Sequence, residues 1–253
     1  MSNDVNKAAW DEEHLDAWIE RFGTPTVYAE KIKKDPYTIL GPLRTHFCDV
    51  SGKKILNIMG SNGNKAVALS LLGANVTIVD FSESNQMYAM QLAEAAGVSI
   101  DYKCMDVLAF QGKGDFDLAF AEMGILHYFT DLSHFYNTVY TALMDGGEFI
   151  IRDFHPISTK LISSRGTTAK VRKHKIDGDY FSKDLIEKNV SYSKYAGESD
   201  VARVYLRNWT LGEIVTEATR CGFKVNALIE EPNLSSDVFD KGIPKTFVLK
   251  LFK

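Results

Sequence analysis

The sequence predicts an α/β fold: a doubly wound, mostly parallel seven-stranded sheet with an antiparallel C-terminal strand and helices on both faces. Between residues 54 and 154, short apolar segments alternate with segments of helical pattern, and the connections are short. This alternation is typical of parallel strands joined by right-handed crossovers, which place helices on both faces of the sheet. The last two apolar segments, 223–231 and 245–252, are joined by a loop too short for a crossover helix, so we expect them to run antiparallel.

Each element of this expected fold has a local signal in the chain. Apolar runs predict the strands, and helical patterns that end near a glycine predict the helices. Gly73 and Gly97 are suitable helix ends, and Ser82 is a suitable helix cap. The expected strands cover 54–59, 75–81, 98–104, 116–123 and 146–154, and the expected helices cover 63–73, 83–96, 131–144 and 210–222.

Two flanking regions complete the expected single domain of residues 1–253. Residues 1–50 should form a helical N-terminal cap, because apolar side chains recur there at helical spacing. Residues 157–207 are polar and aromatic, and we interpret them as a lid-like insertion near the ligand. Within them, "IDGDYF" at 176–181 is a turn signal that predicts a hairpin between its flanking segments. The helical pattern of the cap is carried by Trp10, His14, Leu15, Trp18 and Phe22.

The overall composition excludes several classes of protein. The 253 residues are 45% hydrophobic and 25% charged, which is typical of a globular chain. The 29 Lys and Arg against 33 Asp and Glu give a net charge of −4, so no broad basic field favours a nucleic-acid partner. No apolar run approaches the roughly 18 residues of a membrane helix, and the polar first residues do not resemble a signal peptide. Three widely spaced cysteines without a CxxC pair favour a reducing cytoplasm and no metal site.

The turn after the first expected strand, "MGSNGNKA", is a candidate ligand site. It is not a dinucleotide fingerprint, because Lys65 stands where G-x-G-x-x-G requires its third glycine. Gly60 and Gly63 still allow close approach of a ligand to the backbone, and the following helix directs N–H groups toward it. Asp80 ends the second strand, where a carboxylate can accept hydrogen bonds from two ribose hydroxyls.

Five segments in order resemble the motifs of the class I S-adenosylmethionine (SAM)-dependent methyltransferases. They are "ILNIMGSNG", "VTIVDFS" with Asp80, "CMDVLAF" with Asp106, "FDLAFAEMGILHYF" and "LMDGGEFII". The resemblance implies SAM as cofactor and S-adenosylhomocysteine as product, with Asp80 on the ribose and Asp106 facing the adenine amine. It also implies the reversed strand pair at the sheet edge.

The chain departs from the family pattern at four positions. Asn57 stands where the family usually has an acid, which removes a charge that would help hold the methionine end of SAM. Met59 and Ser61 stand where glycines are usual, and Asp145 replaces a proline. These departures leave open whether cofactor affinity or geometry is altered.

Twelve residues are candidates for cofactor binding. Asp80 has the alternative role of capping the following helix, and Asp106 that of a turn residue. Glu122 is expected either near the cofactor's ammonium group or in solvent, and Met123 and Gly124 are expected to supply backbone and apolar contact. The set is Gly60, Ser61, Asn62, Gly63, Asp80, Phe81, Ser82, Asp106, Val107, Glu122, Met123 and Gly124.

Three residues that follow strand ends are candidates for catalysis: His127, Asp153 and His155. His127 could accept a proton from a substrate hydroxyl or amine, or it could be a packed histidine at a helix start. Asp153 and His155, in "RDFHP", could form a base and its orienting partner or bind a cation. The simpler alternative is a surface pair with Arg152 before a turn, and no third metal ligand is evident.

The sequence therefore predicts a SAM-dependent methyltransferase that transfers a methyl group to an oxygen or nitrogen of a small-molecule acceptor. A SAM-binding protein without activity and a methyltransferase for a protein acceptor are the alternatives. A nicotinamide-dependent oxidoreductase is disfavoured by the missing fingerprint. We expect no nucleic-acid or membrane partner, and the sequence leaves the acceptor and the oligomeric state open.

Overall fold

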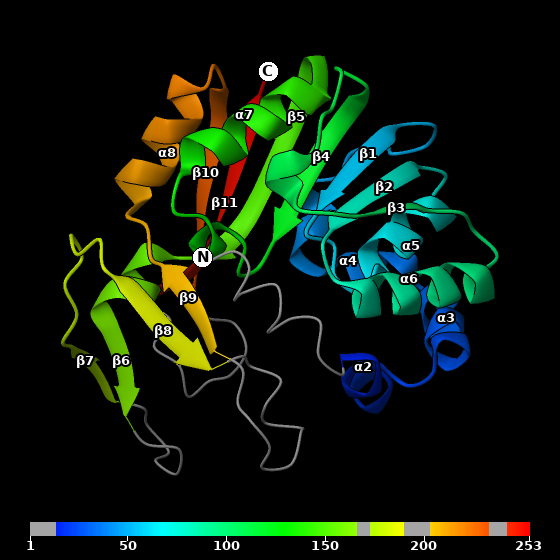
Figure 1. The fold of residues 1–253 in the computed structure, drawn as a ribbon, viewed down its shortest axis with the longest axis horizontal. Coiled ribbons are helices and arrows are strands. Elements are labelled where there is room, and N and C mark those ends of the chain that lie inside the picture. Colours follow the sequence, from blue (N-terminus) through cyan, green and yellow to red (C-terminus); the bar gives the residue numbers. More distant parts are fainter. Residues whose placement is uncertain (1–13, 166–172, 190–202, 233–241) are drawn as a thin grey trace.

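The computed structural model describes residues 14–165, 173–189, 203–232 and 242–253 (Figure 1). One seven-stranded sheet has the order β10-β11-β5-β4-β1-β2-β3. β11 runs antiparallel to both neighbours, whereas the strands from β5 to β3 are parallel to one another. The predicted fold class and the antiparallel final pair are thereby confirmed. The strands are β1 Lys54–Ile58, β2 Asn75–Asp80, β3 Asp101–Cys104, β4 Phe116–Glu122, β5 Leu143–Phe154, β10 Lys224–Pro232 and β11 Pro244–Phe252.

Helices cover both faces of this sheet and enclose two apolar cores. On one face, α2 to α6 pack against side chains such as Ile55 and Phe120. On the other, α7 and α8 pack against side chains such as Leu56 and Phe149. The helices are α2 His14–Phe22, α3 Pro25–Lys34, α4 Pro36–Leu40, α5 Asn64–Leu71, α6 Glu83–Ala96, α7 Leu132–Ala142 and α8 Leu211–Arg220. Short helical turns are η1 Gly41–Thr45, η2 Val107–Ala109, η3 Leu126–Tyr128 and the π-helical η4 Ile157–Leu161.

The helix ends follow from local chemistry. The Ser82 hydroxyl accepts a hydrogen bond from Asn85 N at 3.3 Å at the start of α6, and Gly97 ends this helix with φ +74°. Thr210 and Glu213 form a reciprocal capping box at the start of α8. Thr24 caps α3 immediately before a proline, and this start signal helps divide the N-terminal cap into separate helices. None of the described helices has the length and apolar character to span a bilayer.

The N-terminal helices pack against α6. Trp18 is 4% exposed and stacks with Phe22, whose ring in turn stacks on Tyr28. The Tyr88 hydroxyl of α6 donates to Gly23 O at 2.9 Å, which fixes the turn between α2 and α3. Trp10, part of the predicted helical pattern, lies outside the described residues.

The insertion differs in one respect from the sequence prediction. β6 Ile162–Arg165 pairs with β7 Lys173–Ile176, and β8 Leu185–Asn189 pairs with β9 Arg203–Arg207. The predicted hairpin across 176–181 is therefore wrong, because β7 and β8 each pair with another strand. Instead, Asp177 N and Gly178 N both donate to Leu161 O, so the turn is attached to η4. A buried lysine, Lys160, reinforces this attachment by donating to Ser182 O at 2.7 Å and Asn208 O at 2.8 Å.

Candidate functional site

The turn after β1 has a backbone path that normally requires glycine. Met59 and Ser61 adopt φ of +49° and +50°, in the left-handed region, and Gly63 follows with φ +73°. A side chain on Gly60 would meet Asn57 Oδ1 at 2.6 Å, so this position has no room for a Cβ. The turn is thus tightly packed against the sheet, and the backbone it presents is held in strained conformations of the kind found at ligand sites.

Asp80 lies at the end of β2, beside this turn, and is 8% exposed. Its Oδ2 accepts from Ser61 N at 3.0 Å, and its Oδ1 accepts from Ser82 N at 3.0 Å. The carboxylate therefore joins the turn after β1 to the start of α6. Both of these backbone groups belong to predicted cofactor-binding residues, so the structure brings the glycine turn and the predicted ribose acid together.

A hydrogen-bond chain extends from Asp80 to the N-terminal helices. The Trp18 indole donates to Asn85 Oδ1 at 2.8 Å, and Asn85 Nδ2 donates to Asp80 Oδ1 at 3.4 Å. Because an indole N–H can only donate, it fixes the amide so that its NH₂ group faces the carboxylate. The sequence analysis did not identify Asn85, whose only signal was its position in the first turn of α6.

The remaining predicted cofactor residues surround the same edge of the sheet. The exposed Asp106 caps η2 by accepting from Leu108 N at 2.9 Å, and Val107 is buried. Phe81 O accepts from the Cys104 thiol at 3.3 Å. The buried side chain of Asn62 accepts from Asn64 N at 3.3 Å, at the start of α5.

Glu122 ends β4 within a network of ion pairs. Its carboxylate contacts Lys65 Nζ at 2.6 Å and Arg152 Nη1 at 3.2 Å. Arg152 continues to Glu231 at 2.8 Å, and the Thr246 hydroxyl donates to the same carboxylate at 2.6 Å. Glu122 is 9% exposed in its side chain, so it does not extend into solvent. Its partners are charged side chains, and its neighbour Met123 has φ +60°; its place near the cofactor's ammonium group stays a prediction.

The carboxylate of Asp153, on β5, is 3% exposed and is occupied by backbone donors. Gly124 N and Phe154 N each donate to Oδ1 at 2.7 Å. Ile125 N and Leu126 N donate to Oδ2 at 3.0 and 2.9 Å. Asp153 thus fixes the loop that follows β4, which contains the predicted residues 123–124 and His127.

His155 is 1% exposed and has partners other than Asp153. Its Nδ1 accepts from Ile157 N at 3.1 Å, which leaves the proton on Nε2, 2.8 Å from Glu230 Oε1. Burial lowers the pKa of this imidazole, against the opposing effect of Glu230. The two residues therefore do not form the base-and-orienter pair considered from the sequence.

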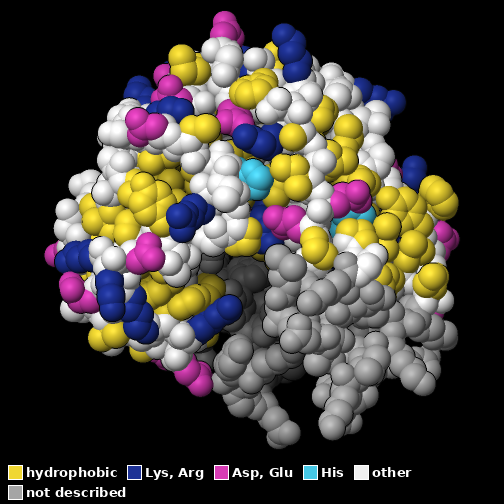
Figure 2. Space-filling view, turned by 180° about the vertical axis from the view of Figure 1, so that it is seen from behind, with side chains coloured by type: hydrophobic (Ala, Val, Ile, Leu, Met, Phe, Trp, Pro, Cys, Tyr) yellow, Lys and Arg dark blue, Asp and Glu magenta, His cyan; other side chains and the backbone are white. Residues whose placement is uncertain are grey.

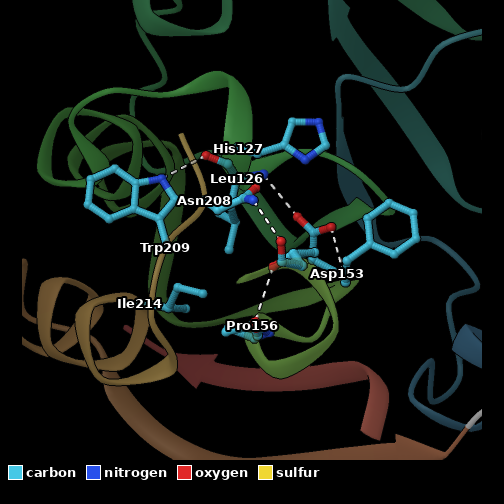
Figure 3. Close-up of a pocket in the computed structure, with 9 residues that line it drawn as sticks. Leu126, His127, Asp153, Pro156, Asn208, Trp209 and Ile214 are labelled. Carbon is cyan, nitrogen blue, oxygen red and sulfur yellow. Dashed lines mark hydrogen bonds between the residues drawn. The ribbon is translucent and has the colours of Figure 1, made fainter. Parts of the chain in front are cut away.

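His127 borders a small, half-open pocket of about 20 Å³ (Figure 3). No described residue makes a hydrogen bond to its ring nitrogens, and the ring packs edge-on against Tyr128 with centroids 4.6 Å apart. Burial lowers the pKa of His127, although Asp153 acts in the opposite direction. The Trp209 indole closes one wall and donates to Leu126 O at 3.0 Å. The pocket is lined by Leu126, His127, Asp153, Phe154, Pro156, Thr159, Asn208, Trp209 and Ile214.

Three fully or partly buried histidines predict a loss of stability in acid. Burial lowers the pKa of His46, His127 and His155 below the ordinary value of 6.5. At a pH between the folded and unfolded pKa values of these histidines, the unfolded chain binds more protons than the folded chain. Their contribution to the free energy of unfolding is therefore complete above about pH 6.5, and it is lost as the pH drops through the lower pKa values of the folded state. Urea unfolding at about pH 7.5, 6.5 and 5.5 should show a decreasing free energy of unfolding. A His155→Gln variant should show a smaller decrease, and a flat wild-type profile would contradict the prediction.

The site also contains residues that the sequence analysis did not assign to it. Lys65 was noted only as a failed glycine position, and Arg152 only as a partner in a possible surface pair. Both are brought to Glu122 by strands and helices that are distant in sequence. Trp209 lies just beyond the expected insertion and has no signal of its own in the sequence, yet it lines the pocket.

Part of the chain matches known methyltransferases in sequence. Residues 55–147 match the family model for a methyltransferase domain. The ubiquinone biosynthesis O-methyltransferase of Chromobacterium violaceum is 32% identical over 118 residues, covering 44% of this chain and 50% of that protein. The chain spans about half the length of the curated relatives it matches.

Two solved structures share the fold over most of the chain. One is a SAM-dependent methyltransferase from Listeria monocytogenes, with TM-score 0.67, 20% identity, and coverage of 85% of this chain and 97% of that one. The other is a SAM-dependent methyltransferase from Mesorhizobium loti, with TM-score 0.67, 21% identity, and coverage of 85% and 98%. Residues 55–147 thus match a methyltransferase-domain family, and the chain shares the fold of these SAM-dependent methyltransferases.

Proposed function

We propose that the protein binds SAM and transfers its methyl group to a small-molecule acceptor. The observation that carries this proposal is the joining of the left-handed turn after β1 to Asp80 within the matched segment. Three features fit a ligand with a ribose: Gly60 has no space for a Cβ, the turn is left-handed, and an acid stands at the end of β2. The predicted cofactor-binding residues are retained in this proposal.

Bound SAM supplies a methyl group on a sulfonium, which is already an activated electrophile. The chain's own residues must then align the acceptor, exclude water and accept a proton where the acceptor carries one. We place the reacting group of the acceptor beside His127, because apolar side chains of Trp209, Ile214 and Phe154 and the polar Asn208 meet there. We assign proton acceptance to His127, since its low pKa keeps the imidazole neutral near pH 7.

An oxygen acceptor is favoured over nitrogen, because the curated relatives are named O-methyltransferases.

Residues 157–207 would act as a lid over a single domain. Their described strands lie on the side of the sheet toward which β4 and β5 point (Figure 1). Figure 2 shows basic and acidic side chains interleaved over the face in view, which suits a small acceptor better than a polyanion. The three widely spaced cysteines, without a CxxC pair, support a cytoplasmic location.

Calorimetric titration with SAM, S-adenosylhomocysteine and NAD⁺ tests the cofactor. Binding of the first two with micromolar affinity and no binding of NAD⁺ is expected, and binding of NAD⁺ alone would overturn the proposal. Transfer of labelled methyl to phenols, carboxylic acids, amines and peptides then tests the acceptor. Tight SAM binding with no transfer to any class would favour the alternative of a SAM-binding protein without activity.

The assignment of His127 predicts a kinetic effect without a binding effect. His127→Asn should lower kcat by about 10²–10⁴-fold, the usual contribution of a positioned general base. The dissociation constant of S-adenosylhomocysteine should stay unchanged, because His127 borders the acceptor pocket. His134→Asn, on the exposed side of α7, is the matched control. Unchanged kcat in His127→Asn with a hydroxyl acceptor would exclude this role.

A further inference from the structure

The ion pair between Lys65 and Glu122 lies where α5 begins and β4 ends. Lys65 Nζ and Glu122 Oε2 are 2.6 Å apart, and the two side chains are 23% and 9% exposed. Lys65 follows Gly63 and Asn64 directly, so this pair spans from the turn after β1 to the end of β4. A cation and an anion are thus held side by side at the edge where the glycine turn presents its backbone.

The neighbouring position on β1 supplies no charge to this pair. Asn57, on β1, is 4% exposed and neutral, and its Oδ1 accepts no hydrogen bond among the described residues. Asn57 pairs with Phe120 in the β1–β4 register, and Glu122 lies two residues farther along β4, on the same face. Arg152 holds the other oxygen of Glu122 at 3.2 Å. Because Arg152 is shared with Glu231, negative charge remains on Glu122 for an ammonium group if Lys65 moves away from it.

We propose that Lys65 and Glu122 together recognise the amino-acid end of the cofactor. This inference rests on the proposed function, because it assigns residues to one part of the proposed ligand. The amino-acid end of SAM carries one ammonium and one carboxylate. Glu122 binds the ammonium and Lys65 binds the carboxylate, so the ligand replaces the ion pair that the protein makes with itself.

Such a replacement makes the pair selective for the ligand's amino-acid group. A ligand with both charges restores a partner to each side chain, with charge-assisted hydrogen bonds in place of the broken pair. An adenosine derivative without the amino-acid group offers neither charge, so the Lys65–Glu122 ion pair remains intact when such a ligand binds. The neutral Asn57 is then tolerated, because the acidic partner of the ammonium comes from β4 rather than β1.

Three ligands that share the adenosine group allow the effects of the two charges to be measured separately. S-adenosylhomocysteine carries both, S-adenosyl-3-thiopropylamine carries only the ammonium, and 5′-methylthioadenosine carries neither. Lys65→Met should weaken S-adenosylhomocysteine on the order of tenfold and leave 5′-methylthioadenosine within about twofold. It should not weaken S-adenosyl-3-thiopropylamine, whose ammonium no longer has to displace Lys65 from Glu122. Glu122→Gln should weaken both ammonium-bearing ligands on the order of tenfold and leave 5′-methylthioadenosine unchanged. Calorimetry measures each dissociation constant.

Lys103→Met is the matched control, since Lys103 also has an acidic partner, Asp101 at 2.9 Å, but lies on exposed β3. Binding of 5′-methylthioadenosine shows in each variant that the adenosine site is folded. If the Glu122→Gln variant fails to fold, the affinities of the Lys65→Met variant for the three ligands test the inference without it. Equal weakening of all three ligands, or of none, would overturn the inference and leave the proposed function standing. Failure of the wild type to bind any of them would overturn both.

Discussion

Asp80→Ala is expected to weaken S-adenosylhomocysteine binding by about 10²–10⁴-fold, because two hydrogen bonds to a charged group contribute roughly 1.5–3 kcal/mol each. The carboxylate lies at the end of β2 beside the turn that carries Gly60 and Gly63. It is the acidic group that we assign to the ribose hydroxyls. Calorimetric titration of the variant with S-adenosylhomocysteine measures the loss.

The control for this prediction must separate binding from folding, because Asp80 also holds Ser61 N and Ser82 N. Asp80→Asn keeps the shape and one acceptor oxygen, so one of these two N–H groups keeps its partner, and the variant should still bind weakly. Asp117→Ala is a suitable surface control, since its carboxylate accepts from Lys54 N at the far end of β1. A folded Asp80→Ala variant with wild-type affinity would refute the ribose assignment.

Asp153→Ala is expected to cause the largest loss of folding stability, on the order of 4 kcal/mol or more, because it leaves buried N–H groups without acceptors at about 1–3 kcal/mol each. Four backbone N–H groups, those of residues 124, 125, 126 and 154, donate to this carboxylate. Urea unfolding that compares the midpoint and the slope of the transition with wild type measures the change.

An exposed aspartate with a related local role provides the comparison. Asp131 caps α7 by accepting from Ser133 N at 2.8 Å, and Asp131→Ala should cost only about 1 kcal/mol. Asp153→Asn should fall between the two, because its amide retains one acceptor oxygen. If Asp153→Ala were no less stable than Asp131→Ala, the loop after β4 would not depend on this carboxylate.

The fold could be predicted from the sequence because its signals are local and repeated. The strand–helix rhythm sets parallel pairing, and the short connection before β11 sets the reversed strand. Ser82 and Gly97 mark the ends of α6 through their own chemistry. The position of Asp80 follows from the strand that carries it, so the acid of the candidate site was predictable as well.

Partners distant in sequence could not be predicted in the same way. "RDFHP" suggested chemistry by Asp153 and His155, but the donors to Asp153 include residues 27–29 positions earlier. The turn at 176–181 has ordinary hairpin signals, yet its flanking strands pair elsewhere. Met59 and Ser61 suggested an altered turn, whereas the backbone adopts left-handed conformations there at a cost of roughly 1–2 kcal/mol per residue.

The placement of β11 has a consequence for the order in which the protein folds. β11 follows β10 in the chain, yet it lies between β10 and β5. β10 therefore has no neighbour in the sheet until β11 has entered. The β5 residues that pair with β11 lie about a hundred residues earlier in the chain, as in the Phe247–Asp153 pair. Forming such long-range pairs is slow, because the loop must close before any contact is gained. We expect β1 to β5 to assemble first and the β10–β11 edge to complete the sheet last.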